Sequence, residues 1–292
     1  MLRRANPKTG LSFSQVTYGS MRLNAVEYQN SAKEGSAFLR SVLDAGITTF
    51  HSSSEYNTFD FFSACMQELY RSVSKDCIEH IVKIAAPHFK DDTYDDHLLE
   101  QRINSFLQLT GAVCIDAVQW LVRNEPNTDE HRLKILAEFS HAFEDKMDNL
   151  CKQGKVKSWY SFPYSLPFAK EVINLKSCAG IVDYLNFLEL QDAKYLESIK
   201  NQSESFIALR PLFAKRIYEM PKNMTTALCE TLGTNDLFTA AVQFPLLSSV
   251  VTSEVISIRK YDQLKTLLAA TSHVKSNDQL FASVLSLLTK GN

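Results

Sequence analysis

The sequence has little net charge and no long hydrophobic run. Its 31 lysines and arginines are nearly balanced by 33 aspartates and glutamates, which leaves a formal charge of −2 at pH 7. A chain with this balance has no basic field to attract nucleic acid or an anionic membrane. No stretch approaches the roughly 18 apolar residues of a spanning helix, and the polar N-terminus lacks the apolar core of a signal peptide. We therefore expect neither nucleic-acid nor membrane partners.

Metal-ligand spacing and paired cysteine motifs are also missing. The 7 histidines show no ligand spacing with cysteine or carboxylate, so we expect no metal site. None of the 6 cysteines forms a CxxC pair. Cysteines scattered through a chain of this length are typical of reduced thiols in a cytoplasmic protein. The six are Cys65, Cys77, Cys114, Cys151, Cys178 and Cys229.

Nothing in the composition divides the chain into parts. No Pro/Gly/Ser-rich linker, low-complexity tract or charge block interrupts its 292 residues. With 45% hydrophobic and 22% charged residues, the chain matches an ordinary globular protein that can bury a large core. We therefore expect a single domain over residues 1–292.

Strand and helix patterns alternate along the whole chain. Short runs typical of strands fall at 11–18, 47–50, 78–84, 113–122, 156–162, 181–188, 206–212 and 250–258. Helical spacing of apolar residues follows them at 32–44, 59–73, 94–109, 133–150, 167–175, 193–200, 236–247 and 261–270. Eight such units predict an α/β fold, a single (β/α)8 TIM barrel. We expect an N-terminal strand or hairpin after a turn at 7–10, and an extra C-terminal helix at about 278–288.

The segment 45–56 shows how this barrel would present a functional group. Its sequence, AGITTFHSSSEY, reads as a helix end, a turn at Gly46, a short β-branched strand and a polar loop that ends in Tyr56. In (β/α)8 barrels, side chains at the carboxyl ends of strands form the active site. The segment therefore places Tyr56 at the mouth of the predicted barrel.

This segment resembles the aldo-keto reductase signature, in which a strand ends in an aspartate and a proton-donating tyrosine follows five residues later. Further short stretches resemble the family's strands in the expected order, and the FPYS sequence at 162–165 suggests its compact bacterial branch. The matching stretches are TYGSMRL at 17–23, IVKI at 81–84, CIDAVQW at 114–120, QGKVKS at 153–158 and ALRPL at 208–212.

The resemblance implies a reductase of small-molecule carbonyl compounds. In the family, a hydride passes from a nicotinamide to the carbonyl carbon while a tyrosine hydroxyl protonates the oxygen. Tyr56 matches that tyrosine, and Lys83 matches the lysine that tunes it. A nearby ammonium favours the phenolate and lowers a tyrosine pKa from its usual value of about 10.

Two catalytic positions depart from the family pattern. His51 stands where the aspartate belongs, and Glu55 is the only nearby carboxylate that could substitute for it. The family's histidine falls on Leu121 when counted from Asp116, or on Arg123 when the asparagine-proline ending is matched. An arginine there could donate hydrogen bonds to a carbonyl or carboxylate, so Arg123 joins the candidate catalytic residues.

Several cofactor-contact positions implied by the resemblance also carry residues that differ from those of the family. The family's serine-asparagine pair falls on Phe162 and Pro163, and its stacking aromatic falls on Leu209. NADP is the implied cofactor, and these departures allow that its binding has been lost. The residues that fall on cofactor positions are Gly19, Ser20 and Met21 after the first strand, Asn186 in place of a glutamine, Arg210, Ser257 in place of a glycine, and Arg259 near the 2′-phosphate.

Three interpretations follow from these matches and departures. The first is a reductase that uses Tyr56 and Lys83. The second is a pseudoenzyme, a barrel kept as a binding or regulatory module with a protein partner. The third is altered chemistry in which His51 or Arg123 supports proton transfer without nicotinamide. Fold alone cannot choose among them.

Overall fold

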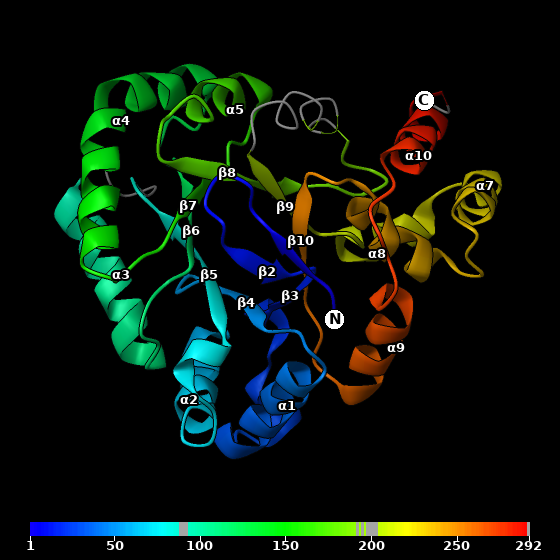
Figure 1. Cartoon of the computed structure of the whole chain (residues 1–292), viewed down its shortest axis with the longest axis horizontal. Coiled ribbons are helices and arrows are strands. Elements are labelled where there is room, and N and C mark those ends of the chain that lie inside the picture. Colours follow the sequence, from blue (N-terminus) through cyan, green and yellow to red (C-terminus); the bar gives the residue numbers. More distant parts are fainter. Residues whose placement is uncertain (88–92, 191–192, 194–195, 197–203, 291–292) are drawn as a thin grey trace.

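The chain folds into a closed barrel of eight parallel strands (Figure 1), here described from a computed structural model. The structure describes residues 1–87, 93–190, 193, 196 and 204–290. The strand order around the barrel is β10-β3-β4-β5-β6-β7-β8-β9. The strands are β3 (Val16–Gly19), β4 (Thr49–Ser52), β5 (Glu79–Ala85), β6 (Ala117–Leu121), β7 (Trp159–Ser161), β8 (Cys178–Tyr184), β9 (Ser205–Leu209) and β10 (Val251–Ile256). The predicted TIM barrel is confirmed.

An antiparallel hairpin of β1 (Arg3–Ala5) and β2 (Ser12–Ser14) closes the amino end of the barrel. Asn6 Nδ2 donates hydrogen bonds to Tyr160 Oη at 2.6 Å and to the Ala179 carbonyl oxygen at 2.8 Å. Phe13 packs with apolar side chains inside the barrel. The hairpin fills one end of the barrel, so the opposite mouth is the end left for function.

The prediction of one opening strand at 11–18 was wrong. The structure has two strands there, β2 and β3, separated at Gln15. The Gln15 side chain is buried and donates to the carbonyl oxygen of Thr271 at 2.7 Å. This bond turns the chain out of the hairpin and into the barrel. The expected N-terminal hairpin itself is confirmed.

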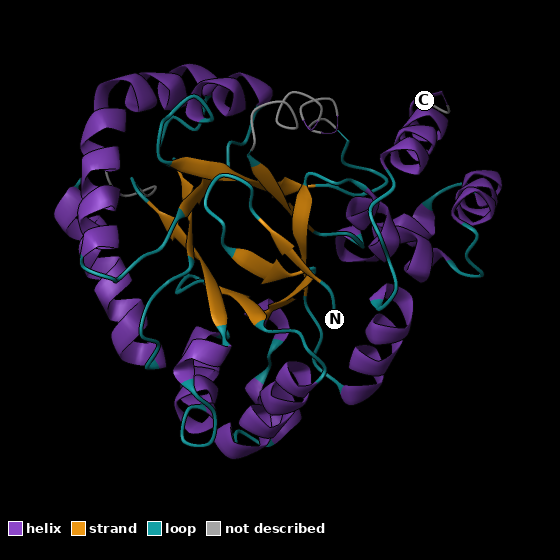
Figure 2. Ribbon diagram, viewed as in Figure 1, coloured by secondary structure: helices purple, strands orange, loops and turns teal. Residues whose placement is uncertain are grey.

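Helices surround the barrel (Figure 2), as the alternating pattern predicts. The expected helix at 193–200 lies largely outside the described residues. One helix that the sequence analysis does not predict, α7, packs with α8 and α10. Met224, Leu228 and Leu232 recur on it at helical spacing, and Leu228 is its fully buried residue. The helices are α1 (Ala32–Asp44), α2 (Phe59–Leu69), α3 (Asp96–Thr110), α4 (Asp129–Lys152), α5 (Leu166–Val172), α7 (Lys222–Leu232), α8 (Leu237–Leu247), α9 (Tyr261–Thr271) and α10 (Asp278–Lys290).

Short 3₁₀ helices occupy several of the connections. Two of them, η1 (Ser20–Arg22) and η2 (Ala25–Tyr28), follow β3 and lead to α1. The others are η3 (Lys75–Cys77) and η4 (Phe213–Glu219). The expected extra C-terminal helix is confirmed as α10.

Apolar side chains fill the space between strands and helices and also the barrel interior. Between the layers, the Trp120 ring stacks on Phe143 with centroids 4.1 Å apart, and Trp159 meets both rings edge-on. The barrel interior is packed with apolar side chains, among them Ile81 and Val182. The barrel is therefore a solid scaffold, and chemistry is confined to its ends.

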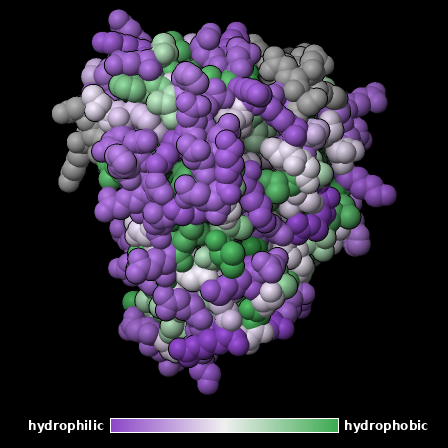
Figure 3. All heavy atoms as spheres, turned by 60° about the vertical axis from the view of Figure 1, so that its left-hand side comes forward, coloured by the Kyte–Doolittle hydropathy of each residue, from purple (hydrophilic) through white to green (hydrophobic). Residues whose placement is uncertain are grey.

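The outer surface is mostly hydrophilic. Figure 3 shows one face on which polar side chains predominate and apolar ones gather only in small patches. All six cysteines are free thiols. No helix in the described part of the chain is long and apolar enough to cross a bilayer.

A buried carboxyl group interrupts the apolar packing around β10. Glu254 is fully buried, and neither of its carboxylate oxygens has a hydrogen-bond partner among the described residues. Burial raises the pKa of Glu254 well above its usual value, and the positive charge of Arg4 opposes this shift. The folded state therefore favours the protonated, neutral carboxyl.

This carboxyl should make folding stability fall as pH rises. Because the pKa of Glu254 is higher in the folded than in the unfolded state, ionisation above the unfolded pKa favours unfolding, by up to about 1.4 kcal/mol per pH unit. We expect Glu254→Gln to gain stability relative to the wild type between pH 5 and pH 8 in urea titrations. Glu230→Gln, at an exposed site on α7, is the matched control. A constant difference between wild type and Glu254→Gln across this range would contradict the assignment.

Candidate active site

The carboxyl ends of neighbouring strands bring the predicted catalytic residues to one mouth of the barrel. His51 lies near the end of β4, and the loop that follows carries Glu55 and Tyr56. Lys83 lies on β5, where it is paired in register with Gln119 of β6. Arg123 follows the end of β6. Parallel strands in a closed barrel all end at the same face, so residues far apart in sequence meet here.

A single carboxylate joins two cations at this mouth. Glu55 Oε2 lies 2.6 Å from Lys83 Nζ, and Glu55 Oε1 accepts a hydrogen bond from Arg123 Nη2. The three side chains are between 18% and 25% exposed, so solvent screens their charges only partly. The carboxylate expected from the strand therefore comes from the loop.

The loop that carries Glu55 is fixed to β5. Ser53 Oγ donates to the carbonyl oxygen of Lys83 at 3.1 Å and accepts from the amide of Glu55 at 3.2 Å. These bonds explain why Glu55 points toward Lys83. Glu55 was absent from the predicted site residues, because its place next to Tyr56 was the only sequence signal and it did not give a side-chain direction.

His51 does not take over the role of the missing aspartate. Its imidazole is buried inside the barrel, and Nε2 lies 2.7 Å from Gln119 Oε1, an oxygen that can only accept the proton. Burial lowers the pKa of His51 to about 4; the bond to Gln119 opposes this shift and the charge of Lys83 adds to it. His51 is therefore neutral at physiological pH and bonds Gln119.

Tyr56 lies close to both Lys83 and His51. Its ring centroid is 5.5 Å from Lys83 Nζ, which sits over the ring, and 6.2 Å from the imidazole of His51. Burial raises the pKa of Tyr56, and the charge of Glu55 raises it further, while Arg210 acts in the opposite direction. The phenol therefore stays protonated at neutral pH and is in the form that can donate a proton.

Aromatic side chains and arginines complete the rim. Phe162 packs edge-on against Tyr164 and Tyr184, with centroids 4.7 and 5.2 Å away. The Arg210 guanidinium lies 4.1 Å from the centroid of Tyr184. Leu121, one of the two positions matched to the family histidine, is buried with Phe162 in an apolar cluster. Of those two positions, only Arg123 offers a polar group to the mouth.

Five of the seven residues matched to the cofactor positions, Gly19, Ser20, Met21, Ser257 and Arg259, follow β3 and β10, and the first four form a seam there; Asn186 and Arg210 follow β8 and β9 instead. A Cβ on Gly19 would come within 2.6 Å of Ser257 Oγ, so the glycine is what allows the two segments to approach closely. Ser20 Oγ is buried without a hydrogen-bond partner among the described residues. Met21 is 60% exposed beside them.

Arg259 stands at the end of this seam, just before α9. Its Nη1 lies 3.2 Å from Glu27 Oε1, and Lys260 Nζ lies 3.7 Å from Glu27 Oε2. The side chain of Lys260 makes no capping bond at the N-terminus of α9, and Gln263 Oε1 accepts from the backbone amide of Arg259 at 2.9 Å. Backbone amides at a helix N-terminus, together with nearby cations, are the usual groups that bind phosphate.

Asn186 has a local role. Its Oδ1 accepts from the amides of Leu188 and Glu189, and its Nδ2 donates to Glu189 Oε2 at 2.6 Å and to the Arg210 carbonyl oxygen at 3.1 Å. All of its amide donors are used. Asn186 therefore holds the turn after β8 and fixes the backbone of Arg210.

The seam fits a dinucleotide better than the Asn186 side of the mouth does. Ser20 Oγ lacks a partner in the described part of the chain, and Arg259 lies beside the N-terminus of α9, where the side chain of Lys260 makes no capping bond. Asn186, in contrast, could bind a carboxamide only by breaking its own turn. Gly19, Ser20, Ser257 and Arg259 are thus the residues that could hold a nicotinamide dinucleotide.

Comparison with known proteins agrees with this arrangement. No protein-family model and no curated protein matches the sequence. The holo form of an aldo-keto reductase from Bacillus halodurans, however, aligns with a TM-score of 0.76 at 16% identity, over 98% of this chain and 96% of that one. The chain has the aldo-keto reductase fold. The resemblance read from the motifs is confirmed at that level.

Other solved structures give the same result. The apo form of the Bacillus halodurans enzyme aligns with a TM-score of 0.74 at 15% identity, over 98% of this chain and 96% of that one. A thermostable aldo-keto reductase in complex with the inhibitor epalrestat aligns with a TM-score of 0.75 at 14% identity, over 98% and 100% of the two chains. The match therefore extends over essentially the whole fold.

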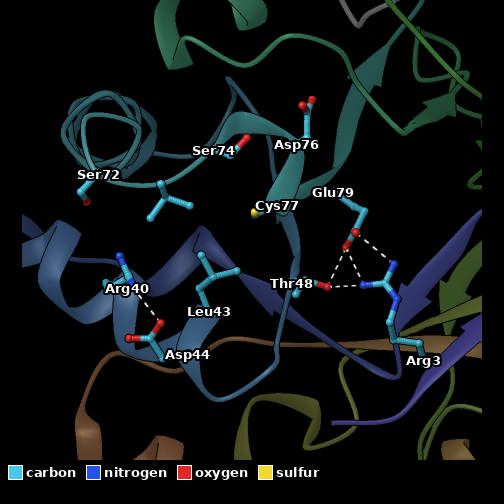
Figure 4. A pocket seen from close by; sticks show the side chains of 11 residues that line it. Arg3, Arg40, Leu43, Asp44, Thr48, Ser72, Ser74, Asp76, Cys77 and Glu79 are labelled. Atoms are coloured by element: carbon cyan, nitrogen blue, oxygen red, sulfur yellow. Dashed lines mark hydrogen bonds and ion pairs between the residues drawn. The ribbon is translucent and has the colours of Figure 1, made fainter.

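Hollows and charged clusters elsewhere on the molecule have a structural role. A surface hollow of about 610 Å³ lies at the amino end of the barrel (Figure 4). There Glu79 accepts from Arg3 Nη2 at 3.0 Å and from Thr48 Oγ1 at 2.8 Å, and Arg40 pairs with Asp44. The bond from Arg3 joins the hairpin to the barrel, and the Arg40–Asp44 pair lies within α1. Within the described residues, no three His, Cys, Asp or Glu side chains are placed to hold a metal ion.

The neutrality of His51 gives a prediction about pH. Because its pKa is lower in the folded than in the unfolded state, stability due to the neutral ring is present above the unfolded pKa of about 6.5 and is lost as pH falls toward about 4. His51→Gln keeps a donor for Gln119 but does not titrate. We expect wild type to lose on the order of 3 kcal/mol relative to His51→Gln between pH 7 and pH 4.

Urea unfolding followed by tryptophan fluorescence at several pH values measures this difference. His141→Gln, on the exposed face of α4, is the control for loss of a surface imidazole. Parallel pH profiles for wild type and His51→Gln would show that the imidazole protonates without cost in the folded state.

Proposed function

We propose that this protein is an aldo-keto-reductase-type oxidoreductase that reduces the carbonyl group of a small molecule with NADPH. The observation that carries the proposal is the 2.6 Å ion pair between Glu55 and Lys83 beside Tyr56. It supplies the carboxylate-lysine pair that the family resemblance calls for, from a loop residue in place of a strand residue. Residues 1–292 would act as one domain.

Tyr56 is the proton donor in this proposal. Its protonated phenol gives a proton to the carbonyl oxygen as that oxygen gains negative charge. The charge of Arg210 favours the phenolate that remains, and Lys83 Nζ lies over the ring. Glu55 holds Lys83 in position and also fixes Arg123, whose guanidinium can donate a hydrogen bond to the substrate.

The dinucleotide would supply the hydride when it is bound. Gly19, Ser20 and Ser257 would lie along it, and Arg259 would face the 2′-phosphate that distinguishes NADPH from NADH. For this contact Arg259 must exchange Glu27, 3.2 Å away, for the phosphate. Because this exchange costs free energy, NADPH should bind more weakly than it would in a site whose arginine has no ion-pair partner.

A second candidate function is a binding or regulatory module without catalysis. Two observations favour it: the side-chain amide of Asn186 is committed to its own turn, and Glu27 pairs with both Arg259 and Lys260. In this case Tyr56 and Lys83 would have only a structural role, and the barrel would bind another protein. The cytoplasmic location and the absence of nucleic-acid partners stay predictions from composition.

Turnover of variants distinguishes the two candidates. We expect NADPH-dependent reduction in a screen of aldehydes and ketones, and a fall of about 100-fold or more in kcat for Tyr56→Phe, because a positioned proton donor contributes this much. Glu55→Gln should lower kcat as well, and Glu55→Asp should recover part of it. Tyr218→Phe, at an exposed tyrosine of η4, is the matched control and should keep full activity.

Two results would count against the reductase. If Tyr56→Phe binds NADPH and turns over at the rate of the wild type, Tyr56 is not the donor. If neither NADPH nor NADH binds and no carbonyl compound is reduced, the binding-module function replaces the reductase.

A further inference from the structure

Cationic and anionic side chains both lie at the mouth of the barrel. Lys83, Arg123 and Arg210 contribute three cations, and Glu55 is the carboxylate that pairs with the first two. The neutral His51 beneath them adds no charge. A cation in such a site that has no ion-pair partner favours an anionic ligand, since opposite charges attract most strongly where solvent is partly excluded.

Arg210 is the cation least committed to the protein. It is exposed, it lies on the face of Tyr184, and it makes no ion pair with any carboxylate in the described part of the chain. Asp183 and Glu189 lie within electrostatic reach of Tyr184, but Asp183 Oδ1 accepts from the Tyr184 amide and Glu189 Oε2 accepts from Asn186. A guanidinium held on an aromatic face keeps its edge N–H groups available for a ligand.

The backbone around this guanidinium is held in an unusual conformation. Arg210 has a φ of 57° and Tyr164 a φ of 60°, although neither is a glycine. For side chains of this size, the left-handed region costs roughly 1 kcal/mol or more, and such strain gathers at functional sites. The Asn186 amide holds Arg210 in this conformation through its carbonyl oxygen. The two strained residues follow β9 and β7, on either side of Tyr184 at the end of β8.

We propose that the barrel mouth binds a ligand that carries a carboxylate, with Arg210 as the residue that recognises it. A planar guanidinium presents two parallel N–H groups that match the two oxygens of a carboxylate. Tyr184 positions the guanidinium on the face of its ring. If the proposed function holds, this ligand is the substrate, an oxo acid whose carbonyl group faces Tyr56; the binding itself does not depend on turnover.

Binding of matched acids and esters tests the proposal. The ligands are pyruvate and 2-oxobutanoate, their methyl esters, and inorganic phosphate, each titrated calorimetrically into the full chain. We expect the acids to bind about tenfold or more tighter than their esters, since a hydrogen bond to a charged group contributes this much. In Arg210→Gln this preference should disappear, and in Arg210→Lys part of it should return.

Arg216→Gln is the matched control. Arg216 is also an exposed arginine over an aromatic ring, 5.0 Å from the centroid of Phe213, but it lies on η4, where its Nε is 3.8 Å from Glu219 Oε2. This variant should bind acids and esters as the wild type does. Tyr184→Leu removes the surface on which Arg210 lies and should weaken acid binding more than ester binding, which checks the same point without changing Arg210.

Each result decides one point. Equal or absent binding of acids and esters to the wild type would overturn the proposal, and so would an acid preference that survives in Arg210→Gln. Phosphate binding as tight as acid binding, and lost in Arg210→Gln, would overturn the choice of carboxylate. An acid preference without any NADPH-dependent turnover would remove the reductase and leave this proposal standing, whereas equal turnover of acids and esters would do the reverse.

Discussion

Closure of the parallel barrel is the constraint on which the rest of the structure depends. Eight strands that run in one direction must all end at the same face. The N-terminal hairpin fills the other end, where Asn6 and Phe13 contact the barrel interior. Residues from the loops after β4, β6 and β9, which are far apart in sequence, are therefore brought together at one mouth, where they share charges and hydrogen bonds.

Within that mouth, Glu55 organises the electrostatics. It joins Lys83 and Arg123, which would otherwise repel each other in a partly desolvated site. The strand position that carries an aspartate in the family signature holds a neutral imidazole, bound to Gln119. The carboxylate partner of the lysine thus comes from the loop after β4 and not from the strand. Because loops accept substitutions more readily than barrel strands, such an arrangement is physically accessible.

The fold could be predicted from the sequence because hydrophobic periodicity and strand-helix alternation depend on local residues. The bounds of α1 and the positions of the eight barrel strands follow from such patterns. The break at Gln15 and the pairing of Glu55 do not, because each depends on a partner distant in the chain: Thr271 for Gln15 and Lys83 for Glu55. The same is true of Asn186, whose family position suggested a cofactor contact but whose amide holds its own turn.

Cofactor binding tests the central claim of a working reductase most directly. A calorimetric titration of the purified protein with NADPH, and separately with NADH, measures it without a known substrate. We expect saturable binding of NADPH with a dissociation constant in the micromolar range, and weaker binding of NADH because NADH lacks the 2′-phosphate that Arg259 would contact. No heat and no stabilisation at millimolar concentrations of either nucleotide would contradict it.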